Sequence, residues 1–243
     1  MPPRALIVVA LVGCVTLNGC AAMRMKMRYG TLQSQTKLSE SIFLELRSDL
    51  PPTVYLAETS SADSTITVRP ALERQLAALG YELVDAPDSA TYVMQVNHRQ
   101  FVEVELSEDQ TLGDALSSAF TAGFGVGIAA DIAGAGGDVV AGAGLAAGAV
   151  GFIVDANTKH IAHLLSTDVR LSESLPGYDS LAAPRAGVEN AQSITGQVRY
   201  HETELVSGAS KVNLELKESL PAILEGTGQT LARLLPPRAS AQP

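Results

Sequence analysis

The sequence predicts an α+β fold: a mixed or antiparallel sheet with packing helices, interrupted by an inserted Gly/Ala-rich transmembrane helical hairpin. Three features support this prediction. Residues 92–106 alternate apolar and polar side chains, as a half-buried strand does. Residues 70–79 and 221–235 repeat leucines at helical spacing, and residues 112–155 are almost entirely Gly, Ala and larger aliphatic residues.

The N-terminal residues 1–19 have the form of a lipoprotein signal peptide. Arg4 supplies a positive charge, residues 5–15 form an apolar run too short to cross a bilayer, and small residues then precede a cysteine. The ending LNGC resembles a bacterial lipobox, which makes Cys20 the lipid-attachment residue and its N-acyl diglyceride, with palmitate among the acyl chains, the expected covalent group. No other cofactor is expected. A rival LVGC ends at Cys14 but leaves a shorter apolar run, so we prefer Cys20.

Residues 20–37 are predicted to be a lipidated tether. Ala21, rather than Asp, follows the cysteine. The resemblance to Gram-negative lipoproteins then implies sorting to the outer membrane, so we expect an outer-membrane, lipid-anchored protein of a Gram-negative bacterium. Basic side chains cluster here, namely Arg24, Lys26, Arg28 and Lys37. They suit contact with anionic lipid headgroups, and a solvated linker explains them equally well.

Residues 38–111 are assigned to the first part of the α+β domain. Strands are expected at 39–46, 53–57 and 81–84. Between the second and third of these, a helix begins near Pro70, places Leu72, Leu76 and Leu79 on one face, and stops at Gly80. The long strand at 92–106 places Tyr92, Met94, Val96, Val102, Val104 and Leu106 on one face.

Residues 112–155 are predicted to form the membrane hairpin. Residues 115–130 and 139–154 are uncharged, and each run would make a helix of about 24 Å, short for an average bilayer but closer to the thin outer membrane. Asp131 and Asp138 mark the exposed turn between them. A buried hairpin in a soluble core and a flexible Gly/Ala loop are the alternatives.

Small residues recur at four-residue spacing in both halves of the hairpin. Such faces let helix backbones approach closely in lipid, where no hydrophobic force joins helices. The expected helix-packing residues are Ala119, Gly123, Gly127, Ala143, Gly144, Ala147, Gly148 and Gly151. They predict a homo-oligomer, in which the chain's main partners are copies of itself and outer-membrane lipid.

Residues 156–235 are assigned to the second part of the α+β domain, and 236–243 to a flexible tail. Strands are expected at 166–175 and 194–206. A final helix at 221–235 buries Ile223, Leu231 and their apolar neighbours, although Gly226 and Gly228 weaken it in isolation.

Catalytic and metal-binding patterns are weak. His160 and His163 form an HxxH whose rings could share a helix face and bind a metal, yet no third ligand lies nearby, so polar residues beside the hairpin are the better interpretation. No P-loop, GxSxG or HExxH motif is present. The net charge of −9 disfavours nucleic acid as a partner. We predict no catalytic residues, no metal and no enzymatic activity.

The order of several segments resembles the TraT family of outer-membrane lipoproteins. These are the lipobox at Cys20, LSESIFLE at 38–45, ALGYELVDAPDSATYVMQVN at 78–97, the Gly/Ala hairpin and SKVNLELKESLPAILE at 210–225. The resemblance implies an oligomeric protein that mediates surface exclusion in conjugation between cells carrying related plasmids, and complement resistance. It implies contacts with the mating apparatus of donor cells or with complement components.

A second class of function remains open on the residues alone. The hairpin is typical of glycine-zipper lipoproteins in general, so a structural envelope lipoprotein not tied to conjugation is the alternative. Neighbouring transfer genes would favour surface exclusion, and an isolated chromosomal location would favour the structural role.

Overall fold

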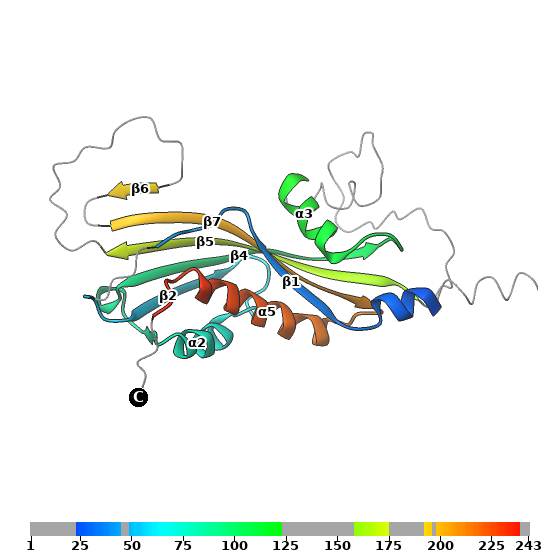
Figure 1. Cartoon of the computed structure of the whole chain (residues 1–243), viewed down its shortest axis with the longest axis horizontal. Coiled ribbons are helices and arrows are strands. Elements are labelled where there is room, and N and C mark those ends of the chain that lie inside the picture. The colour runs from blue at the N-terminus through cyan, green and yellow to red at the C-terminus, as the bar shows by residue number, and fades with distance from the viewer. Residues whose placement is uncertain (1–22, 45–48, 123–157, 175–191, 196–197, 239–243) are drawn as a thin grey trace, which may run out of the picture. The chain divides into compact units, whose positions relative to one another are not determined.

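A computed structural model describes residues 23–44, 49–122, 158–174, 192–195 and 198–238. These residues form a mixed sheet with packing helices, which confirms the α+β class (Figure 1). Among them, no helix is both long enough and apolar enough to cross a membrane. Residues 123–157, most of the predicted hairpin, lie outside the described residues.

One sheet of seven strands contains all the described strands. Its order is β1-β7-β5-β4-β2-β3, and β6 pairs with β7. Strand β2 is parallel to β3 and β4, whereas β6 and β7 are antiparallel. The bounds are β1 Gln33–Leu38, β2 Thr53–Ser60, β3 Glu82–Val84, β4 Tyr92–Leu106, β5 His160–Ser174, β6 Gln192–Thr195 and β7 Val198–Val212.

The helices are residues 23–29, α2 Arg69–Ala78, the short η1 Pro87–Ser89, α3 Leu112–Ala122 and α5 Leu216–Arg233. Helix α2 starts and stops where the sequence predicts. Pro70 occupies the first turn, where a missing N–H costs nothing, and Gly80 adopts a φ of 78° just beyond the C-terminus.

The chain divides into two compact units. Unit 1 contains 1–35, 102–164 and 208–220, and unit 2 contains 36–101, 165–207 and 221–243, so β4, β5 and β7 each contribute a segment to both. In unit 2, helices α2 and α5 lie side by side beneath the sheet in Figure 1. A buried apolar cluster fills this unit, including Leu56, Leu72, Met94 and Leu231.

Gly228 allows α2 and α5 to approach closely. A Cβ atom at this position would lie 2.8 Å from the Cβ of Ala71 and 2.9 Å from the backbone nitrogen of Leu72. Arg74 and Gln75 of α2 also bind the carboxylate of Glu225 in α5. The glycine that weakens α5 in isolation is therefore what lets it pack against α2.

In unit 1, α3 buries one face, formed by Leu112, Ala115, Leu116 and Ala119. Leu112 and Leu116 lie over Gly208 of β7, where an added Cβ would be 2.9 Å and 3.2 Å from their methyl groups. The first residues of the predicted hairpin thus pack on their own chain.

Several predicted boundaries are wrong. The first strand is β1 at Gln33–Leu38, which overlaps the end of the tether predicted at 20–37. Residues 39–44, where the first strand was expected, have no strand structure. Residues 23–29 of the same stretch are helical. Strand β5 begins at His160 rather than 166, the alternation at 194–206 covers two strands, and α5 begins at Leu216, five residues before Pro221. Polar edge strands such as β1 bury little on either side, so their alternation is weak.

Candidate functional site

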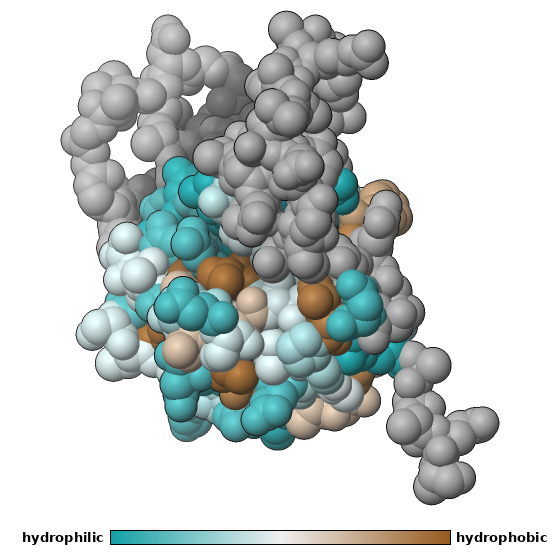
Figure 2. All heavy atoms as spheres, turned by 90° about the vertical axis from the view of Figure 1, so that its left-hand side faces the viewer, coloured by the Kyte–Doolittle hydropathy of each residue, from teal (hydrophilic) through white to brown (hydrophobic). Residues whose placement is uncertain are grey.

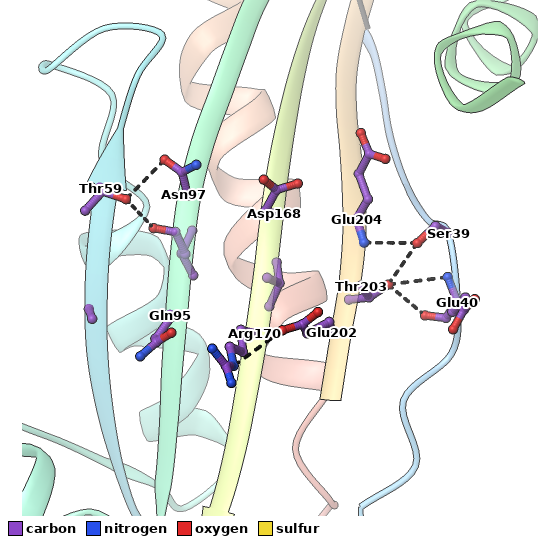
Figure 3. A pocket seen from close by; sticks show the side chains of 13 residues that line it. Ser39, Glu40, Thr59, Gln95, Asn97, Asp168, Arg170, Glu202, Thr203 and Glu204 are labelled. Carbon is purple, nitrogen blue, oxygen red and sulfur yellow. Dashed lines mark hydrogen bonds and ion pairs between the residues drawn. The ribbon is translucent and has the colours of Figure 1, made fainter. Parts of the chain in front are cut away.

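A polar hollow of about 730 Å³ lies on the sheet of unit 2, on the face opposite α2 and α5 (Figure 3). Strand alternation creates it. The side chains of β4 that point toward the helices are apolar, and the next ones along, Gln95 and Asn97, point to the open face. Thr59 of β2 donates a hydrogen bond to Asn97 Oδ1 at 3.1 Å.

Carboxylates dominate the charge of this hollow. Asp168, Glu202, Glu204 and Glu40 line it, against the single guanidinium of Arg170 among the lining residues. Arg170 Nε lies 3.4 Å from Glu202 Oε1, and its guanidinium lies over the ring of Tyr200, 4.2 Å from the centroid. The surface therefore suits a cationic or hydrogen-bonding partner.

The chain segment after β1 closes one side of the hollow. Ser39 donates its backbone N–H to the carbonyl of Glu204, and its hydroxyl accepts the N–H of Glu204. The Thr203 hydroxyl donates to the carbonyl of Glu40 at 3.0 Å. Both hydroxyls are therefore held in hydrogen bonds that join this segment to β7.

Seen from the side, the described residues of Figure 2 present mainly hydrophilic groups, with brown apolar patches that are small and separate. This distribution is ordinary for a water-exposed surface.

The two histidines of the HxxH pattern do not share a face, in contrast to the helical arrangement in which they could have bound a metal. His160 and His163 lie three residues apart in a strand, so their side chains point to opposite faces. His160 stacks on Tyr29, with ring centroids 3.9 Å apart. Burial is the largest cause that lowers the pKa of His160, to about 4, and the charge of Arg28 acts in the same direction. No group of three potential metal ligands occurs within the described residues.

His163 belongs to a chain of hydrogen bonds that resembles a catalytic triad in residue types only. Its Nδ1 lies 2.5 Å from the Ser219 hydroxyl, and its Nε2 lies 3.1 Å from the carboxylate of Glu103. Ser219 is fully buried, so no substrate can reach its oxygen. The chain of bonds satisfies buried polar groups.

The sequence interpretation missed a similar arrangement in unit 2. His98 is fully buried, with Nδ1 3.0 Å from the Thr167 hydroxyl and Nε2 2.9 Å from Glu58. Glu58 also accepts the N–H of Val68, the residue that precedes α2. Burial raises the pKa of Glu58, but the hydrogen bonds from His98, Val68 and Thr67 outweigh it and lower the pKa overall. The sequence could have predicted that His98 is buried, because the strand alternation places it on the same face as Tyr92, Met94 and Val96.

Of the predicted helix-packing residues, Ala119 is described, and it is buried on the face of α3 that includes Leu116. The other seven, together with Cys20, Asp131 and Asp138, lie outside the described residues. Their roles remain predictions.

A family model for the enterobacterial TraT complement resistance protein matches residues 31–235 of the chain. The chain belongs to the TraT family. It is 32% identical to a TraT complement resistance protein of Escherichia coli, over 97% of the chain and 100% of the relative. The TraT complement resistance protein of Escherichia coli K12 has the same identity and coverage, and a further E. coli relative is 29% identical over 91% of the chain and 93% of its own length.

Every segment that carried the TraT resemblance downstream of the lipobox falls within the matched residues or directly beside them. All of these relatives are named complement resistance proteins. TraT is a family of surface proteins rather than of known enzymes, which agrees with a hollow suited to contact.

Proposed function

We propose that this TraT protein is a lipid-anchored oligomer of the Gram-negative outer membrane that acts in surface exclusion during conjugation and in complement resistance. The observation that supports it most is full-length similarity, because the alignment covers 97% of this chain and all of an E. coli complement resistance protein. Similarity of that extent includes the segments on both sides of the hairpin, and not one domain alone.

The anchor in this proposal is the N-acyl diglyceride on Cys20. Several acyl chains hold a protein firmly in a membrane, whereas one chain binds only marginally. Cys20→Ala should therefore abolish lipid labelling and signal cleavage, as read by intact mass and by metabolic labelling with palmitate. Labelled lipid on the variant, with Cys14 intact, would refute the assignment.

Because α3 packs on its own chain, the rest of the predicted hairpin, residues 123–155, supplies the proposed oligomer contacts and a route to the cell surface. Gly123→Ile combined with Gly127→Ile should separate the helix backbones and convert the oligomer into monomers or aggregates. Light scattering in mild detergent measures the size. An unchanged size in the double variant would contradict packing through these glycines.

Two surfaces are proposed to meet external partners: the turn with Asp131 and Asp138, and the acidic hollow of unit 2. The hollow offers exposed carboxylates, and Glu202 is 62% exposed. Glu202→Lys reverses its charge there. Glu73→Lys, on exposed α2 behind the sheet, makes the same change away from the hollow and is the matched control.

Mating frequency tests the function. Recipients that express the intact protein should accept a related plasmid less often than recipients that lack it. Replacement of the turn residues, or Glu202→Lys, should reduce that exclusion at equal abundance, whereas Glu73→Lys should not. Survival in serum with active complement is the parallel measurement. Equal mating frequencies and equal survival with and without the protein would favour the structural glycine-zipper lipoprotein instead.

A further inference from the structure

The short helix at residues 23–29 has one face fixed to its own chain. Met25 and Tyr29, four residues apart, are 6% and 3% exposed and form a buried cluster with Val212. The Tyr29 hydroxyl donates a hydrogen bond to the carbonyl of Glu108, and its ring stacks on His160. The apolar cluster, the hydrogen bond and the ring stack together set the orientation of this helix within unit 1.

The opposite face of the same helix is apolar and exposed. Met23 is 64% exposed and Met27 is 72% exposed, and a spacing of four residues places them on one side. Of the five exposed large apolar side chains among the described residues, four belong to unit 1: Met23, Met27, Leu32 and Leu216. In a protein in water, this burial pattern would leave two methionines without packing partners.

Basic residues flank the exposed methionines. Arg24, Lys26 and Arg28 are all exposed, and the helix contains no acidic residue, although the whole chain has a net charge of −9. Helical geometry places Arg24 and Arg28 on one flank of Met27 and Lys26 on the other. Apolar side chains bordered by cations form the pattern of a helix that lies in the interface of an anionic membrane.

The length of chain to the predicted anchor limits what can cover this face. Two residues, Ala21 and Ala22, lie between Cys20 and Met23, so at most about 10 Å of extended chain joins the backbone of the lipid-modified cysteine to the helix. A lipid surface that holds the acyl chains of Cys20 is thus within reach of Met23 and Met27.

We propose that the face of residues 23–29 formed by Met23 and Met27 lies in the headgroup region of an anionic phospholipid layer, with Arg24, Lys26 and Arg28 against the phosphates. The inference rests on the acylation of Cys20 in the proposed function. It makes residues 20–22 the whole of the tether, and it orients unit 1 on the membrane through Met25 and Tyr29.

The test uses the full-length protein, processed in a Gram-negative host and reconstituted in vesicles, with an environment-sensitive fluorophore on Met27→Cys. The chain without the introduced cysteine, prepared in the same way, measures background labelling of Cys20. In phosphatidylglycerol vesicles, nitroxide-labelled lipid should quench the fluorophore and aqueous iodide should not. A fluorophore on Phe43→Cys, at an exposed residue of unit 2, should show the reverse.

Charge variants distinguish electrostatic attraction to anionic lipid from non-specific adsorption to vesicles. Arg24→Gln with Lys26→Gln should lower the equilibrium constant for insertion of the residue-27 probe by about fivefold per charge in phosphatidylglycerol vesicles, and by much less in phosphatidylcholine. Arg74→Gln with Arg233→Gln removes the same charge from exposed residues of unit 2 and should leave insertion unchanged.

Three results are decisive. In the first, intact mass shows that Cys20 is lipid-modified, but iodide quenches the fluorophore at residue 27 in anionic vesicles. This result would overturn the membrane contact and leave the anchor assignment in place. Protection from iodide without quenching by nitroxide lipid would assign the face to a second copy of the chain and also overturn the proposal. An unmodified Cys20 would refute the anchor, and the same quenching data would then decide the helix contact separately.

Discussion

His98 in unit 2 and His160 in unit 1 are both buried, yet their surroundings differ. Both ring nitrogens of His98 have partners, Thr167 and Glu58, and that carboxylate also binds the start of α2. His160 instead stacks on Tyr29, and its pKa is lowered to about 4 by burial. The ring of His98 is held by hydrogen bonds, whereas the ring of His160 is held by aromatic stacking.

The same contrast holds for the apolar contacts. Unit 2 has a large buried cluster formed by the sheet together with α2 and α5, with Tyr92, Leu56 and Leu72 among its members. Unit 1 has a small buried cluster of Met25, Tyr29 and Val212 and the buried face of α3 over Gly208, and four of its described large apolar side chains are exposed. Among the described residues, unit 1 therefore exposes more large apolar side chains than unit 2.

The largest expected effect comes from Leu72→Ala in unit 2. Leu72 is fully buried in the apolar cluster, so its truncation should lower the free energy of unfolding by about 2–5 kcal/mol. Leu216→Ala makes the same chemical change at a residue that is 53% exposed, and should change it by less than about 0.5 kcal/mol. Denaturant unfolding followed by circular dichroism measures both. Equal losses would mean that the exposed leucine of unit 1 is also part of a core.

Local patterns made some of this structure predictable. Strand β4 has the predicted bounds because its period-two alternation covers fifteen residues. Helix α2 was found from Pro70 and Gly80, whose effects on the backbone are local. The buried face of α3 at Leu112–Ala122 was less clear, because small and apolar residues fit lipid and protein surroundings equally.

Non-local contacts account for most of what was missed. The hollow of unit 2 needs β2, β4, β5 and β7 to lie in that order, and strand order cannot be obtained from alternation. His160 and His163 were spaced for a helix, and only the sheet reveals that β5 contains them. The role of Gly228 depends on Ala71, which is 157 positions away in the sequence.

Acid should destabilise unit 1 through His160. The neutral ring is buried at a pKa of about 4, whereas an unfolded histidine titrates near 6.5. The unfolded state binds more protons between these values, so the free energy of unfolding falls as the pH falls from about 6.5 to about 4, by about 3 kcal/mol in total. Below pH 4 this group causes no further loss.

His160→Phe should remove that part of the pH dependence and keep the stack on Tyr29. Burial also lowers the pKa of His201, but His201 is present in both proteins, so the difference between them isolates His160. Thermal unfolding from pH 4 to pH 7.5 is the measurement. Parallel curves for the two proteins would show that protonation of His160 does not oppose folding.

The smallest expected effects compare two glycines, Gly228 in unit 2 and Gly208 in unit 1. Both positions are too close to neighbouring atoms for an added methyl group. At Gly228 the nearest atoms include the backbone nitrogen of Leu72 and the carbonyl carbon of Ala71, so α2 itself must shift. At Gly208 they are the terminal methyl groups of Leu164, Leu112 and Leu116, which can move by rotation of their side chains.

Alanine therefore costs more at position 228 than at position 208. Overpacking costs about 1–3 kcal/mol, and replacement of a helical glycine returns up to about 1 kcal/mol, so Gly228→Ala should lower the free energy of unfolding by about 1–2 kcal/mol. Gly208→Ala should change it by less than about 1 kcal/mol, because leucine movement and reduced backbone entropy offset each other. Gly113→Ala, where the nearest atoms are at an ordinary 3.5 Å, controls for the added methyl group. If Gly208→Ala lowers the free energy of unfolding as much as Gly228→Ala does, α3 is held as rigidly on its strands as α2 is held on α5. Unit 1 would then be packed as tightly at this position as unit 2 is at Gly228.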